Sequence, residues 1–228
     1  MRKFIIPTIT LFFTLFSHVA ITQNCGCADE GNCPFEITNN STSQVCYTID
    51  AAVNDDLSDP TQGICGVSIS FKHGSIGKLN LTLTSPNGTA VELVGSDNTC
   101  MPFTPIATWD ILFLPCSENC DPATVNNCDD DCVFDACCGW GNALYSATYH
   151  PYQGCLEDFN TGAVNGQWCI DIDNSPSNNG GDLFDFEIIL CDDTGIFCCD
   201  ANGGNQLHPD EAFCIGEDSL DFDLSPNW

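Results

Sequence analysis

Residues 165–173 read NGQWCIDID, and this stretch decides the fold class. Within it, Trp168, Ile170 and Ile172 alternate with small or polar side chains. Successive side chains of a β-strand point to opposite faces, so a period of two predicts a half-buried strand. We therefore expect Trp168, the largest apolar side chain of the stretch, to fill the core, and Asp173 to face solvent.

The same alternation recurs on both sides of this stretch. Upstream, residues 67–84 hold two alternating runs, and a turn that reads SPNG leads to a returning strand at 90–94. Downstream, a loop over 174–181 is followed by an alternating run at 184–190 that counts Phe184 among its inward side chains. Short strands separated by loops rich in Gly, Pro and Asn predict an all-β fold, an antiparallel β-sandwich or jelly roll.

The cysteines predict a disulfide framework. The chain of 228 residues has 18 of them, all after residue 22, and no cysteine pair has the spacing of a zinc knuckle with a histidine beside it. Eight lie within residues 100–155, where apolar periodicity is weak. We interpret that segment as a disulfide-rich loop insertion held by its cross-links. Pairing cannot be assigned from the sequence.

The first residues have the order of a secretory signal peptide: Arg2 and Lys3, a short apolar stretch, then small residues. We therefore expect a secreted protein, extracellular or at the cell surface, with no membrane insertion after signal removal. The expected divisions are a signal peptide (1–22), a cysteine-containing lead-in segment (23–45), the sandwich (46–192, with the insertion at about 100–155) and a cysteine-containing tail that resembles the start of a further module (193–228).

The charge is strongly negative, with a formal value of −28. Such a chain repels phosphate backbones and anionic membranes, which excludes nucleic acid as a partner. Acid excess also serves solubility, and that is the simpler explanation. The sharper hypothesis is Ca²⁺, held by Asp173 and Asp182 at the two ends of the 174–181 loop together with Asn174 or backbone carbonyls. The alternative is that both aspartates cap turns through their own side chains. A second, weaker calcium candidate is the acidic cluster at 129–135.

Two separated stretches carry a resemblance to a known family. In the first, an alternating strand ends at His73, and a turn follows at Ser85, Pro86, Asn87, Gly88 and Thr89. In the second, Asn165, Gly166 and Trp168 begin a strand, and Gly181 and Phe186 follow the loop. Together they resemble the P domain (Homo B domain) of proprotein convertases and bacterial subtilisin-like serine proteases. Lys78 and Phe186 depart from the family pattern, which has an acidic residue and a Trp there.

The resemblance implies a galactose-binding-like jelly roll without catalytic residues. Pro86 and Gly88 suit a tight turn, and His73 is expected to be a structural hydrogen-bonding residue rather than a base or ligand. No Gly-x-Ser-x-Gly elbow or Ser-His-Asp set is recognisable, so we expect no enzyme activity and no cofactor other than calcium.

Three functions stay open at this stage. The first is a non-catalytic binding, adhesion or accessory module of a secreted bacterial surface protein. The second is the P domain of a secreted subtilisin-like serine endopeptidase whose catalytic domain is not in this chain. The third is a calcium-dependent jelly-roll carbohydrate-binding module. The expected partners are other modules of a longer chain or a cell-surface ligand.

Overall fold

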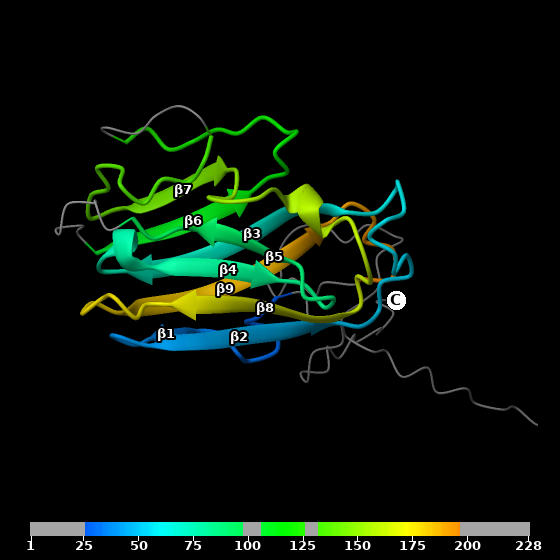
Figure 1. The fold of residues 1–228 in the computed structure, drawn as a ribbon, viewed down its shortest axis with the longest axis horizontal. Coiled ribbons are helices and arrows are strands. Elements are labelled where there is room, and N and C mark those ends of the chain that lie inside the picture. The colour runs from blue at the N-terminus through cyan, green and yellow to red at the C-terminus, as the bar shows by residue number, and fades with distance from the viewer. Residues whose placement is uncertain (1–25, 98–105, 126–131, 197–228) are drawn as a thin grey trace, which may run out of the picture.

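Two β-sheets pack face to face in the computed structural model, which describes residues 26–97, 106–125 and 132–196 (Figure 1). The five-stranded sheet has the order β1 (Phe35–Ile37), β9 (Gly181–Leu190), β3 (Ile64–His73), β6 (Ala107–Phe113) and β7 (Leu144–Tyr149). The four-stranded sheet has the order β2 (Thr42–Ile49), β8 (Gly166–Asp173), β4 (Asn80–Thr84) and β5 (Ala90–Val94). Only the β6–β7 pair is parallel. The all-β sandwich is therefore confirmed.

The core lies between the sheets and follows the predicted alternation. On β8, Trp168, Ile170 and Ile172 are buried, whereas Asp173 is exposed. Two short 3-10 helices, η1 (Ile76–Lys78) and η2 (Leu156–Phe159), complete the secondary structure of the described residues. None of the described helices has the length and apolar character needed to cross a bilayer.

The sandwich begins earlier than the sequence suggested. We expected it to start at residue 46, but β1 and the first half of β2 lie inside the supposed lead-in segment. The reason is that Val45, Tyr47 and Ile49 supply the inward row of β2, which pairs with β8 along its whole length. The predicted signal peptide and nearly all of the tail lie outside the described residues.

The cysteine-rich segment is also less of an insertion than predicted, because it contributes β6 and β7 to the five-stranded sheet. The central strand β3 pairs with β9 on one side and needs β6 on the other to satisfy its backbone. Inward on β6 are Ala107, Trp109, Ile111 and Phe113. The outward Leu112 next to Ile111 makes the sequence look continuously apolar, which hid the period of two.

A β-bulge corrects one expected side-chain direction. Ser70 pairs with Asp185 and the next residue, Phe71, pairs with Leu183, so Phe184 is left without a partner on β3. A bulge adds one extra residue to a strand, so the alternation of side chains on one side of it is out of step with that on the other side. Leu183 is accordingly buried, and Phe184 is 36% exposed rather than inward.

Disulfides cross-link the fold, as the number of cysteines predicted. Every cysteine among the described residues is disulfide-bonded. The defined pairs are Cys27–Cys33, Cys46–Cys169, Cys65–Cys191, Cys116–Cys155 and Cys120–Cys132. Two of these close loops of 123 and 126 residues, and cross-links over long loops restrict the unfolded chain most.

Candidate functional site

His73, the last residue of β3, is fully buried and uses both ring nitrogens within the fold. Its Nδ1 accepts a hydrogen bond from the Ser75 backbone N–H at 3.0 Å. A neutral ring that accepts at Nδ1 carries its proton on Nε2, which donates to Asn174 Oδ1 at 3.0 Å. Burial lowers the pKa of His73 below its ordinary value, because the charged ring would lose its hydration.

Asn174 connects His73 to the loop that follows β8. Its Nδ2 donates to the carbonyl oxygens of Thr38 at 2.9 Å and Asn179 at 2.8 Å. At the other end of the loop, Gly181 pairs with His73, and a Cβ there would overlap the Lys72 carbonyl oxygen. The sequence pattern included His73 and Gly181, but it named Asn174 only as a possible calcium ligand, because its type and loop position gave no sign of a buried structural role.

The second motif cluster lies at the opposite end of β8, where this strand begins (Figure 1). The turn from Ser85 to Thr89 is closed by Ser85 N–H donating to the Thr89 carbonyl at 2.9 Å, and Gly88 adopts φ +86°. Gly88 is needed because side chains disfavour this left-handed region. A Cβ on Gly166 would lie 2.7 Å from Pro86 Cβ, so the two sequence stretches touch here.

Asn165 and Trp168 fix the neighbouring loops to this end of the sandwich. Asn165 exchanges two side-chain hydrogen bonds of 3.0 Å with the backbone of Ala52. Trp168 donates from Nε1 to the Val164 carbonyl at 2.9 Å and packs edge-on against Phe159, with ring centroids 5.5 Å apart. The matched residues thus form two structural clusters rather than one chemical site.

The two aspartates of the main calcium hypothesis, Asp173 and Asp182, lie on different sheets. Asp173 ends β8 and accepts a hydrogen bond from the Ser175 backbone N–H at 2.8 Å, the turn-capping arrangement named as the alternative. Asp182 lies on β9, opposite Lys72 and Glu36. Among the described residues, neither aspartate belongs to a group of three acidic, histidine or cysteine ligand atoms close enough to hold one metal ion. A calcium site remains a prediction, and the Asp129–Asp131 run of the weaker candidate lies outside the described residues.

One group of three potential ligand atoms lies within 4.8 Å among the described residues: Cys116, Cys155 and Glu157. Cys116 and Cys155 form a disulfide, so neither supplies the thiolate that a metal binds. The Glu157 carboxylate instead accepts the backbone N–H groups of Cys116 at 3.0 Å and Ser117 at 2.9 Å. This group is a cross-linked turn rather than a metal centre.

Replacing Asp173 with alanine tests the calcium prediction. If Asp173 caps a turn, the change should cost about 0.5–2 kcal/mol of unfolding free energy, equally with calcium and with chelator. If it binds calcium, the loss should appear only when calcium is present, because bound metal stabilises the folded state. Thermal melts of the wild type and of Asp173→Ala, each with calcium and with chelator, distinguish the two outcomes. A wild-type melting temperature unmoved by calcium would remove the metal hypothesis.

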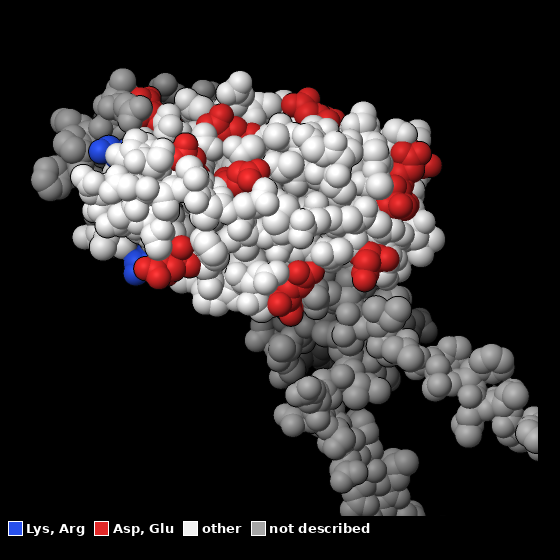
Figure 2. Space-filling model, turned by 60° about the horizontal axis from the view of Figure 1, so that its bottom comes forward, with Lys and Arg blue, Asp and Glu red and all other residues white. Residues whose placement is uncertain are grey.

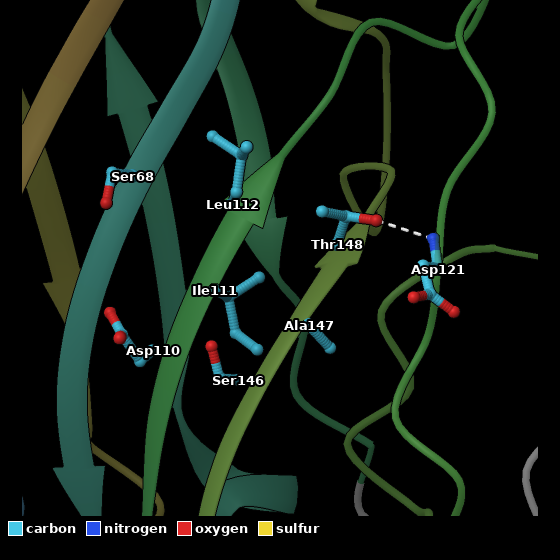
Figure 3. A pocket seen from close by; sticks show the side chains of 8 residues that line it. All are labelled: Ser68, Asp110, Ile111, Leu112, Asp121, Ser146, Ala147 and Thr148. Atoms are coloured by element: carbon cyan, nitrogen blue, oxygen red, sulfur yellow. Dashed lines mark hydrogen bonds between the residues drawn. The ribbon is translucent and has the colours of Figure 1, made fainter.

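The outer face of the five-stranded sheet has a shallow hollow of about 360 Å³. Figure 3 shows Ser68, Asp110 and Ser146 on neighbouring strands, with Asp121 on a separate loop whose backbone N–H bonds Thr148 Oγ1. The lining consists of hydroxyls, two carboxylates and aliphatic groups. Such groups can hydrogen-bond a polar ligand, and none of the lining residues is a histidine or a cysteine.

Two acids on β9 have raised pKa values that the sequence did not suggest. Burial raises the pKa of Asp185, whose Oδ1 accepts the Ala28 backbone N–H at 2.9 Å. Burial also raises the pKa of Glu187, and the nearby Asp185 and Asp29 carboxylates add to the effect. Asp185 therefore has a structural task, since it ties the N-terminal loop to the sheet.

The surface carries many acids and few bases. Figure 2 shows acidic side chains spread across the visible face, with little basic surface at one edge. The basic side chains among the described residues are Lys72 and Lys78. A surface with so few basic side chains disfavours binding to polyanions, and the absence of a nucleic-acid partner stays a prediction.

No protein-family model and no curated protein matches this sequence. Solved structures that are similar to part of the chain include the serine protease of Aeromonas sobria, at 13% identity and TM-score 0.27, over 66% of this chain and 27% of that one. Another is the complex of the Aeromonas sobria serine protease and its chaperone, at 14% identity and TM-score 0.28, over 67% and 27%. A third is an exo-beta-agarase, at 11% identity and TM-score 0.26, over 67% and 19%.

This chain spans about a quarter or less of the length of those proteins. TM-scores this low do not establish a shared fold, and they carry no assignment of function.

Proposed function

We propose that this chain is a secreted, non-catalytic module with a binding or accessory role, of the kind its P-domain-like motifs suggest. The observation that carries the proposal is the state of His73. The ring is buried, and both nitrogens bond the protein's own backbone and amide groups. A catalytic base must instead reach a substrate proton within hydrogen-bond distance. The motif histidine thus serves the fold.

The cross-links support the secreted location. Disulfides persist in oxidising compartments and are rare where thiols are kept reduced. All described cysteines are bonded, and pairs such as Cys46–Cys169 connect neighbouring strands directly. A module built this way keeps its shape outside the cell, where an accessory or adhesive domain would act.

A protease assay tests the absence of catalysis. The purified chain, incubated with a broad peptide library, should give no cleavage above a buffer blank, because the sequence has no recognisable Ser-His-Asp set and both ring nitrogens of His73 are bonded within the fold. The same assay with a serine-directed inhibitor is the control. Reproducible cleavage that the inhibitor blocks would overturn the proposal.

A further inference from the structure

Three of the four sheet edges are covered or very short within the described residues. On β5, Glu92 and Gln153 exchange two backbone hydrogen bonds of 3.2 and 3.1 Å. On β7, the Thr148 N–H donates to the Asp121 carbonyl at 3.1 Å. The edge strand β1 has only three residues. The remaining edge, β2, is eight residues long and has no backbone partner on its outer side among the described residues.

The disulfide between β2 and β8 identifies which backbone groups of β2 face outward. Cys46 lies opposite Cys169 with a Cα–Cα distance of 4.0 Å. Such a close pair is the non-hydrogen-bonded type, in which both residues direct their N–H and C=O away from each other. The period of two then places the backbone groups of Gln44, Cys46 and Thr48 on the free edge.

Two side chains of the N-terminal loop occupy part of this edge. Asn32 Nδ2 donates to the Cys46 carbonyl at 2.9 Å, and Glu30 Oε1 accepts the Thr48 N–H at 2.5 Å. Asn32 Nδ2 also donates to Glu30 Oε2 at 3.1 Å, and the Cys27–Cys33 disulfide closes the loop. We call Glu30 and Asn32 the clip. It occupies two of the outward groups, the Cys46 C=O and the Thr48 N–H, which an added antiparallel strand would bond through two of its residues.

The sequence of β2 suits strand pairing. It reads TSQVCYTI, with no charge, no Pro and several β-branched residues. Long uncharged edges with these properties pair with other chains unless something covers them. In a chain with a formal charge of −28, like-charge repulsion opposes self-association elsewhere, but β2 itself adds none.

We propose that β2 is the strand-pairing edge of this protein, that its partner is β2 of a second copy, and that the clip holds the two apart. Pairing would be antiparallel about a twofold axis, so that the same surface serves both copies. The Gln44 N–H and C=O, which the clip leaves uncovered, would lie near the centre of the paired β2 strands. This inference is independent of whether the module is catalytic.

Removing the clip tests the proposal on the full chain. The Glu30→Ala/Asn32→Ala double variant should dimerise with a dissociation constant at least roughly tenfold below that of the unmodified chain, measured by analytical ultracentrifugation. Glu36→Ala is the charge-matched control, since Glu36 is exposed on β1, which pairs with β9 and belongs to the other sheet from β2. It should sediment like the unmodified chain.

Adding Gln44→Pro to the double variant locates the interface. Proline removes the outward N–H at the proposed centre, and edge strands tolerate it where that N–H makes no internal bond. The triple variant should return to monomer. A double variant that stays monomeric at every concentration, or a dimer that Gln44→Pro leaves intact, would overturn the proposal. If circular dichroism shows that the double variant is unfolded, Asn32→Ala alone, which frees the Cys46 carbonyl, is measured against the same outcomes.

Discussion

Replacing Trp168 with alanine should remove about 3–5 kcal/mol from the free energy of unfolding, as truncation of large buried aromatics does. The side chain is fully buried, contacts Phe159 edge-on and donates to the Val164 carbonyl. Its loss leaves a cavity between the sheets and an unpaired carbonyl, and both effects act in the same direction. Denaturant unfolding followed by circular dichroism measures the change.

The neighbouring Gln167→Ala variant is the matched control. Gln167 lies on the same strand but is exposed, so its truncation should change stability by no more than about 0.5 kcal/mol. If both variants were equally stable, Trp168 could not be the centre of the core.

Gly181→Ala should cost at least about 3 kcal/mol, at the upper end of what overpacking costs. A Cβ at this position would overlap the Lys72 carbonyl oxygen and crowd His73 Cα. Both are backbone atoms of the central strand β3, so no side-chain rotation can relieve the overlap. The strands would have to separate where His73 and Asn174 join the loop to the sheet. Thermal or denaturant unfolding measures the loss.

Gly31→Ala separates this overlap from the general effect of losing a glycine. Gly31 has φ +74° and no atom within 4 Å of an added Cβ, so only the left-handed conformation opposes the change, at about 1–2 kcal/mol. Equal losses for the two variants would mean that β9 does not approach β3 as closely as described.

The strands that the sequence predicted share one property, which is a clean alternation with a single buried face. In strands β3, β4 and β8, an apolar side chain at every second position lies in the core, so the period alone locates these strands. The turn at Pro86 and Gly88 was equally legible, because its residue types follow from backbone conformation.

The elements that the sequence did not reveal depend on tertiary contacts. Strand β1 has three residues and exists because β9 offers it an edge. Leu112 masks the period of β6, and the bulge at Phe184 arises from the register between β9 and β3. At the candidate site, His73 and Gly181 were visible as motif residues, but the link through Asn174 needs the fold to bring β3 and the loop together.

The protonation of His73 links the motif to stability. Its folded pKa lies below the ordinary value of 6.5, so above pH 6.5 the ring is neutral in both folded and unfolded chains. Below pH 6.5 the unfolded chain binds a proton that the folded chain does not. Stability from this residue therefore falls as pH falls, by at most about 1.4 kcal/mol per pH unit, until the folded pKa is reached.

The most direct test of the claim that the motif serves the fold is a nitrogen NMR titration of the His73 ring in the folded protein. We predict a neutral ring with its proton on Nε2, unchanged as the pH is lowered through 6.5, because Ser75 and Asn174 occupy both nitrogens. A ring that carries its proton on Nδ1, or that titrates at or above pH 6.5, would contradict it.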